Sequence, residues 1–154
     1  MKLKFLICLF VFFFLSGCGF TVLNQQRFFN IEDLQITGEK RLTFILKNDL
    51  NIKPIKNNLP INLKINAEKE INVKEKNNKN EITKYEITLI AKVEYSLVKT
   101  NDQKYEFVVK NKSEYSVASQ HSNTLRNEKL ATDLLAEDLS NKILDRIGAK
   151  INDL

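Results

Sequence analysis

The feature that most constrains the fold is an alternation of apolar and polar residues through the middle of the sequence. Apolar residues take mostly odd-numbered positions over 61–73, 85–97 and 105–117, and polar turns separate these runs at 77–80 and 100–103. A period of two is that of a β-strand with one buried face, because successive side chains point to opposite sides of a sheet. Runs joined by such short turns predict a three-stranded antiparallel meander with one apolar and one polar face.

Three further segments complete the predicted domain. Residues 28–36 alternate loosely and predict a first strand, whereas residues 40–51 place leucine and isoleucine at helical spacing. The last segment has apolar residues at helical spacing and predicts a final helix over 124–147. Asn123 suits its N-cap, and Gly148 is expected to end it. The order β-α-β-β-β-α predicts an α+β fold, a four-stranded mixed β-sheet with two α-helices packed on one face.

The face of the sheet away from the helices is predicted to be polar. By parity along the strands it carries Lys64, Lys84, Glu86, Thr88, Lys92 and Glu94. Such a face needs water or a polar partner, because burying unpaired charges is costly.

The first residues have the three regions of a secretory signal peptide. Residues 1–4 contain two lysines and no acid, residues 5–15 are almost wholly apolar, and Ser16 and Gly17 are small. The apolar run covers about half of the ~20 residues that a membrane-spanning helix needs. We therefore expect residues 1–17 to be a signal peptide that is removed on export.

The signal ends in Leu15-Ser16-Gly17-Cys18, which resembles the lipobox of bacterial lipoproteins. The resemblance implies cleavage between Gly17 and Cys18, diacylation of the Cys18 thiol, and acylation of the new amino group. The alternative is that Cys18 is an ordinary buried cysteine at the start of a domain. Gly19 stands where some lipoproteins carry an aspartate that retains them in the inner membrane, so the resemblance implies sorting to the outer membrane.

The rest of the chain is expected to be one domain on a short tether. Residues 18–27 would be a lipidated N-terminus and linker, and residues 28–154 a single α+β lipoprotein domain. Cys8 is lost with the signal, so no disulfide can form and the domain depends on its hydrophobic core. The formal net charge of +5 falls to +3 without Lys2 and Lys4, which is too small to indicate a nucleic-acid partner.

No pattern in the sequence indicates catalysis. His121 is the only histidine, and we expect it in the turn before the last helix. The sequence contains neither a glycine-rich phosphate loop nor a serine-centred elbow, and one imidazole without clustered partners does not define a metal site. We therefore expect no enzyme activity, no cofactor and no bound metal.

Five features in order carry a family resemblance. They are "GCGF" at 17–20, one strand and helix, a meander whose long strand begins "EITKYEITL", a strand end "SEYSVASQ", and a leucine-rich closing helix ending "ILDRI". In this order they resemble the lipopolysaccharide-assembly lipoproteins of Gram-negative outer membranes, the LptE-type family. The sequence departs from that family in composition, since it is rich in Asn, Lys and Ile.

The resemblance implies a non-enzymatic role on the periplasmic side of the outer membrane. A protein of this type plugs an LptD-type β-barrel translocon, assists its assembly and aids insertion of lipopolysaccharide at the cell surface. Its partners would be that barrel, lipopolysaccharide and, through the acyl chains, the inner leaflet of the outer membrane. The sequence leaves open a lipid-anchored adaptor or pilotin-like scaffold of another envelope complex, and a basic patch that binds phospholipid directly.

The resemblance also points to basic residues for the phosphates of lipopolysaccharide. By position these are Lys76 and Lys79 at the meander tip and Arg126 and Lys129 at the start of the last helix. Arg126 is the strongest candidate, since a guanidinium pairs with phosphate through two hydrogen bonds near the amides of a helix N-terminus. The alternative for each residue is an ordinary surface charge.

Overall fold

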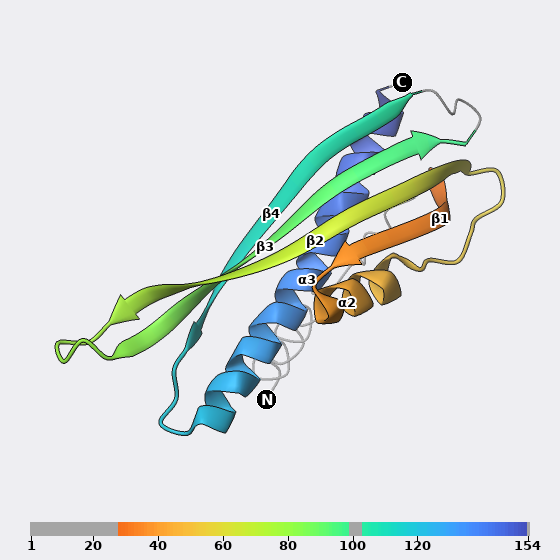
Figure 1. Ribbon diagram of the computed structural model, residues 1–154. Helices are drawn as coiled ribbons and strands as arrows, with labels where there is room; N and C mark the ends of the chain where they lie inside the picture. Colours follow the sequence, from red (N-terminus) through yellow and green to blue (C-terminus); the bar gives the residue numbers. More distant parts are fainter. Residues whose placement is uncertain (1–27, 99–102, 154) are drawn as a thin grey trace, which may run out of the picture.

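The computed structural model of the protein describes residues 28–98 and 103–153, which form four strands and two helices (Figure 1). In chain order the elements are β1 (Phe29–Gly38), α2 (Lys40–Leu50), β2 (Leu59–Lys76), β3 (Ile82–Leu97), β4 (Lys104–Ser116) and α3 (His121–Asn152). This is the predicted β-α-β-β-β-α order.

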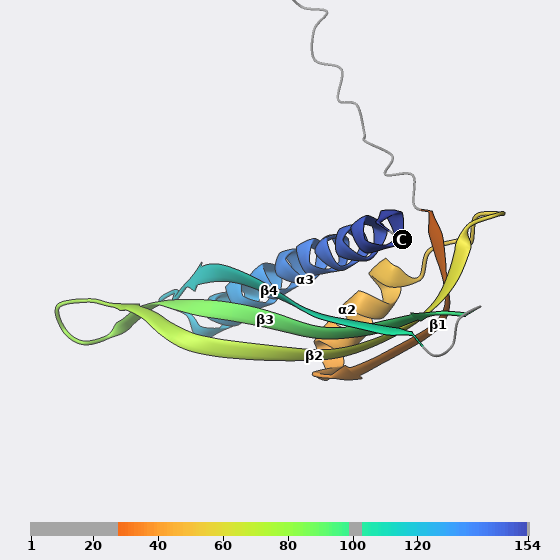
Figure 2. The same cartoon turned by 90° about the horizontal axis from the view of Figure 1, so that it is seen from above.

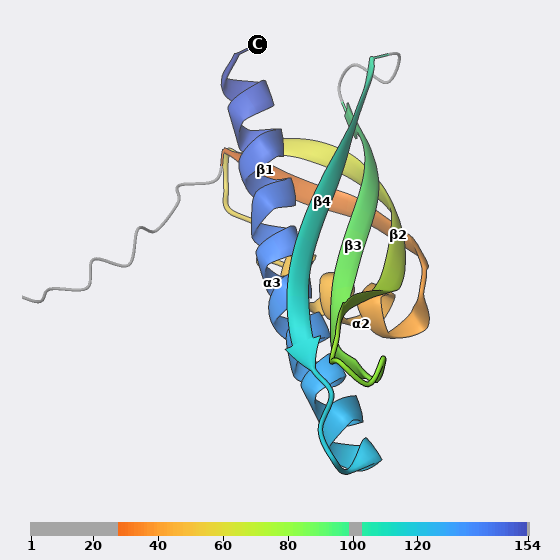
Figure 3. The ribbon, with the colours of Figure 1, turned by 90° about the vertical axis from the view of Figure 1, so that its left-hand side faces the viewer.

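The four strands form one mixed sheet in the order β1-β2-β3-β4. β1 pairs with β2 in parallel, from Phe29 opposite Leu59 to Gly38 opposite Ala67, and the other two pairings are antiparallel. Both helices pack on the same face of the sheet, α2 against β1 and β2 and α3 along β3 and β4 (Figures 2 and 3). The α+β fold predicted from the sequence is therefore confirmed.

The hydrophobic core lies between this face of the sheet and the two helices. Leu42, Leu46 and Leu50 form one stripe of α2, and all three are fully buried. The fully buried apolar residues that complete the core are Ile61, Leu63, Ala67, Ile87, Leu89, Ala91, Ala136, Leu139, Ile143 and Ile147. Each large apolar side chain buried in this way contributes about 1.5–3 kcal/mol, so the layer stabilises a domain that has no disulfide to rely on.

β2 and β3 run on as a long hairpin whose tip forms one extremity of the domain (Figure 1). Asn77 closes the turn at 77–80, because its side-chain oxygen accepts hydrogen bonds from the amides of Lys79 (2.9 Å) and Glu81 (3.0 Å). The tip is therefore a structured turn that presents charged side chains to solvent.

α3 begins earlier than the sequence predicted. Its first residue is His121, which was expected in the preceding turn, and its N-cap is Gln120 instead of Asn123. Gln120 makes no side-chain cap bond, and the amide of Asn123 donates to the Gln120 carbonyl oxygen at 3.1 Å. The N-cap prediction was wrong because contacts with β4, described below, position the start of this helix.

α3 also continues past the predicted end at 147. The helix runs through Gly148 to Asn152, and Ile151 still packs against the core. Packing of one more turn outweighs the helix-ending preference of a single glycine, which costs only about 1 kcal/mol in a helix interior.

The face of the sheet away from the helices is polar and largely neutralises its own charge. Cross-strand ion pairs join Lys92 to Glu68 (3.0 Å) and Lys112 to Glu86 (2.9 Å), and the hydrogen bond from Lys112 holds the pKa of Glu86 below its ordinary value. Thr88, expected to be exposed here, is only 5% exposed. It lies opposite Lys112 in the register, so the long side chains of that ion pair cover a short one.

A glycine with a positive φ makes the turn from β1 into α2. Gly38 has φ +119°, and a Cβ added there would lie 1.9 Å from the carbonyl oxygen of Ala67. The next residue, Glu39, is the N-cap of α2, and its carboxylate accepts a hydrogen bond from the amide of Leu42 at 2.8 Å. Only glycine permits both this backbone conformation and the close approach to β2.

We expect Gly38→Ala to destabilise the domain by more than the ~1–3 kcal/mol of a strained backbone, since the clash with Ala67 adds to that cost. Gly148→Ala is the matched control, because a Cβ there meets only the Phe29 ring at 3.8 Å, and it should stabilise α3 by up to about 1 kcal/mol. Urea unfolding of the two variants measures both effects. Equal stability of the two would contradict the role given to Gly38.

Candidate functional site at the distal end

The distal end of the domain comprises the β2–β3 hairpin from residue 71 to residue 85, the end of β4, and the first turns of α3 (residues 121–129). A hollow of about 470 Å³ lies there between the sheet and the start of α3. The residues that line it are Ile71, Tyr85, Tyr115, Val117, Ala118, Ser119, His121, Thr124, Leu125 and Glu128. Most of these side chains are apolar or aromatic, and Leu125 remains 51% exposed.

Side chains of α3 fix the start of the helix to the end of β4. Thr124 Oγ1 accepts a hydrogen bond from the amide of Ala118 at 2.9 Å, and Asn127 Nδ2 donates to the carbonyl oxygen of Ser116 at 3.0 Å. These bonds take the positioning role that no N-cap side chain fills. The wall of the hollow is therefore held in place by contacts between elements.

Two stacked tyrosines line the sheet side of the hollow. The rings of Tyr85 and Tyr115 lie 5.4 Å apart at an interplanar angle of 21°. Burial, followed by the negative charge of Glu128 and the neighbouring Tyr85, raises the pKa of Tyr115 to about 12. The phenol of Tyr115 therefore stays neutral at physiological pH and can act only as a hydrogen-bonding or stacking group.

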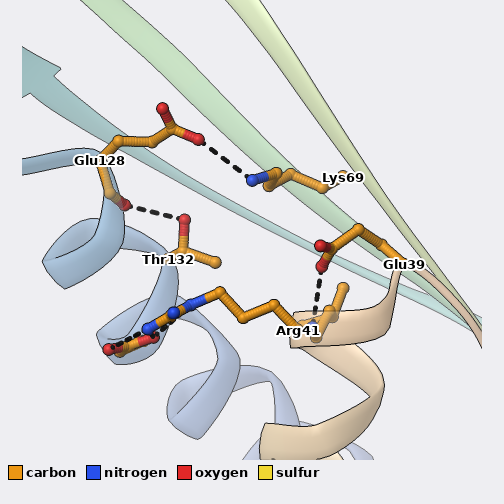
Figure 4. A network of polar contacts seen from close by, with 7 residues as sticks. Glu39, Arg41, Lys69, Glu128 and Thr132 are labelled. Carbon is orange, nitrogen blue, oxygen red and sulfur yellow. Dashed lines mark hydrogen bonds and ion pairs between the residues drawn. The ribbon is translucent and has the colours of Figure 1, made fainter. Parts of the chain in front are cut away.

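Two ion pairs tie α3 to the elements beside it (Figure 4). Lys69 Nζ lies 3.1 Å from Glu128 Oε1, and the Glu128 carbonyl accepts a hydrogen bond from Thr132 at 2.8 Å. Arg41 of α2 reaches both carboxylate oxygens of Asp133, at 2.7 and 2.9 Å. Partly exposed pairs of this kind contribute at most about 1 kcal/mol each, so their main effect is to fix how α3 lies on the sheet.

Sequence reasoning missed the pairing of Lys69. Position 69 has the parity of the helix-facing side of β2, where an alternating strand should carry an apolar residue. The structure explains the exception, since the lysine reaches across to a carboxylate on α3. A charged residue at a core-facing position was the signal that could have indicated such a partner.

The four residues predicted to bind phosphate all lie at the distal end, on two elements. Lys76 ends β2 and Lys79 lies in the hairpin turn, whereas Arg126 and Lys129 lie in the second and third turns of α3. All four are exposed, and none forms an ion pair with another described residue. Because α3 begins at His121, Arg126 is further from the terminal amides than the sequence predicted.

The remaining predicted site residues, Gly17 and Cys18, lie outside the described residues, so lipid attachment stays a prediction. Within 28–98 and 103–153, no three His, Cys, Asp or Glu side chains gather in a way that could hold a metal ion. Neither helix of that part of the chain combines the length and the apolar character needed to cross a membrane.

Solved structures of bacterial lipoproteins share this architecture. Rare lipoprotein B from Shewanella oneidensis superposes with a TM-score of 0.61 at 12% identity, over 79% of this chain and 97% of that one. A minor lipoprotein from Acinetobacter baumannii gives 0.52 at 15% identity, over 80% and 92%. Lipoprotein B from Nitrosomonas europaea gives 0.51 at 13% identity, over 88% and 94%.

These similarities show the fold and nothing finer, because every identity is far below the level at which function follows. No protein-family model and no curated protein matches the sequence. The chain therefore has the fold of these lipoproteins.

The raised pKa of Tyr115 predicts a pH dependence. Because the folded-state value of about 12 lies above the 10.0 of an exposed phenol, stability from the neutral Tyr115 is complete below pH 10 and is lost as the pH rises towards 12. Tyr115→Phe should abolish the titration step near pH 12 in phenolate absorbance and flatten that loss of stability. Glu128→Gln should lower the pKa of Tyr115, because it removes a negative charge. An unchanged titration curve for Tyr115→Phe would rule out the assignment.

Proposed function

We propose that this protein is a lipid-anchored, non-enzymatic component of a β-barrel lipopolysaccharide translocon in the Gram-negative outer membrane. In this role it plugs the barrel, assists its assembly and aids insertion of lipopolysaccharide at the cell surface. The observation that supports the proposal is a fold shared with solved bacterial lipoproteins. In this chain that fold begins ten residues after Cys18, the last residue of the predicted lipobox. The fold supports the class of protein, the lipobox supports the anchor, and the sequence resemblance supports the barrel as partner.

The surface of the domain suits a plug. A large outer-membrane barrel encloses a polar, water-filled lumen, so a plug needs a polar exterior and a core of its own. Here the core is enclosed between sheet and helices, and the open face of the sheet pairs lysines with glutamates from strand to strand. Such a face can lie against water and polar lumen side chains without losing buried apolar area.

The predicted anchor would hold the domain firmly at the inner leaflet. Three acyl chains on Cys18, each contributing about 0.8 kcal/mol per buried methylene, bind a bilayer far more firmly than a single chain. The acyl chains alone would therefore keep the protein at the membrane, so the domain itself can use its surface for polar contacts.

The distal end offers the chemistry for lipopolysaccharide. The phosphates of lipopolysaccharide bind cations, and the distal end carries four exposed basic residues without ion-pair partners among the described residues. The acyl chains or sugars of lipopolysaccharide call for an apolar or aromatic surface, and the hollow beside Tyr85, Tyr115 and Leu125 supplies one. The two kinds of surface lie at the same end of the domain.

Co-purification tests the barrel partner. The detergent-extracted protein should be recovered with a large barrel of roughly 20 or more strands, the size class that encloses a plug. Cys18→Ala is the control for the anchor, since it removes the thiol to be acylated and should release the chain from the membrane fraction. Recovery as a lone monomer from membranes that contain the barrel would contradict the plug role. It would favour the alternative role of an adaptor or pilotin-like scaffold.

Charge reversal tests the lipopolysaccharide contact. Arg126→Glu should weaken capture of lipopolysaccharide at least about tenfold, because a charge-assisted hydrogen bond contributes ~1.5–3 kcal/mol and each 1.4 kcal/mol is a factor of ten. Lys150→Glu makes a comparable change of charge near the other end of α3 and should leave capture unchanged. Both residues are exposed, so thermal unfolding should be similar for the two variants. Equal capture by both would remove Arg126 from the site.

A further inference from the structure

The loop between α2 and β2 lies at the end of the domain opposite the hairpin tip (Figure 1). The surface that it forms with the start of β1 carries exposed apolar and basic side chains. Phe28, Ile52 and Ile55 are 52%, 38% and 54% exposed, and the Phe28 carbonyl accepts a hydrogen bond at 2.9 Å from the amide of Leu59, at the end of the loop that carries the two isoleucines. Lys53 and Lys56 alternate with them in the loop between α2 and β2, and both are exposed. We call these five residues the proximal patch.

Hydrogen bonds tie the backbone of the loop to β1. Asn30 of β1 forms two hydrogen bonds with the backbone of Ile55, donating to its carbonyl at 2.7 Å and accepting from its amide at 2.9 Å. Ile52 and Ile55 also line a small cavity of about 20 Å³ between the loop and β1. The backbone of the loop is therefore fixed to β1 at Ile55, whose side chain is 54% exposed.

The charge of the loop has one sign. Residues 51–59 contain two lysines and no acid, and neither Lys53 nor Lys56 forms an ion pair with any described residue. On the open face of the sheet, by contrast, Lys92 pairs with Glu68 and Lys112 with Glu86. Unpaired cations between exposed apolar side chains fit a surface that is anionic outside and apolar within, as a phospholipid bilayer is.

The position of the patch in the chain points to the same partner. Phe28 lies ten residues after Cys18, so a fully extended chain spans at most about 36 Å between them. α3, with 32 residues, is about 48 Å long. A lipid on Cys18 therefore keeps this end of the domain close to the bilayer, whereas the far end of the domain can lie well away from it.

We propose that the proximal patch docks on the phospholipid surface, with Phe28, Ile52 and Ile55 in the interfacial region and Lys53 and Lys56 on headgroup phosphates. The inference rests on the lipid-anchor part of the proposed function and not on the barrel. The docked patch orients the domain, so that the distal end with its four cations points away from the leaflet that holds the anchor.

Vesicle flotation of the unlipidated Cys18→Ala chain tests the patch directly. We expect binding to vesicles of phosphatidylethanolamine and phosphatidylglycerol, weakened by salt, and much less binding to phosphatidylcholine. Lys53→Glu/Lys56→Glu should lower the partition coefficient at least about 30-fold, because each lysine near an anionic surface contributes about a fivefold factor. The matched control Lys40→Glu/Lys110→Glu reverses two exposed lysines elsewhere. Equal binding by the two double variants would overturn the proposal.

The lipidated chain provides a second readout. It is expected to have no free thiol, so Ile55→Cys gives one site for an environment-sensitive fluorophore. Its emission should shift to the blue on reconstitution into the anionic vesicles, whereas a label at Leu134→Cys, on exposed residue 134 of α3, should not shift. A shift at residue 55 only after barrel is added would overturn the proposal, because the patch would then contact protein.

The two proposals fail in different ways. A mature chain of unacylated mass would remove the anchor, yet flotation of the Cys18→Ala chain would still report on the patch. Absence of barrel in co-purification would remove the plug and leave both vesicle measurements unaffected, since they contain no barrel.

Discussion

Burial of one face of the sheet under two helices is the interaction on which the rest of the structure depends. Leu42, Leu46 and Leu50 of α2 and the apolar stripe of α3 cover the alternating residues of the four strands, and the core needs nothing from outside the domain. The opposite face then has to be stable in water, which it achieves by pairing charges across strands. The two surfaces proposed to bind a partner lie at the two ends of the domain.

The two ends differ in what they can bind. The distal end combines unpaired cations with a hollow lined by stacked tyrosines, and contacts between α3 and β4 keep that hollow open. The proximal patch combines exposed apolar side chains with two lysines, and Asn30 ties the backbone of its loop to β1. The predicted lipid tether joins the domain at its proximal end. It would therefore keep the proximal patch near the membrane and leave the distal end pointing away from it.

The periodicity of apolar residues predicted most of the fold. The features that it did not predict depend on contacts between elements. The strands and the first helix, with the face that each one buries, were predicted from alternation in 61–73 and 85–97 and from the helical stripe in 40–51. Such patterns arise because only one face of each element is buried. The bounds of α3 could not be predicted, since Thr124 and Asn127 position its start through β4 and Ile151 carries it past Gly148.

The sites were harder to predict than the fold. The four distal cations were placed by resemblance, and only the structure shows that they share an end with a hollow. The proximal patch left a signal in the sequence, which is isoleucine alternating with lysine beside proline in a loop. The exposure of these isoleucines follows from the tertiary structure, in which Asn30 ties the loop backbone to β1, and a local pattern does not predict it.

Photo-crosslinking in intact outer membranes, from a crosslinker in place of Lys79 and from one in place of Ile55, can show whether the two ends meet different partners. Position 79 should capture lipopolysaccharide or the barrel, and position 55 should capture phospholipid. Capture of phospholipid from position 79, or of the same protein partner from both positions, would contradict this prediction.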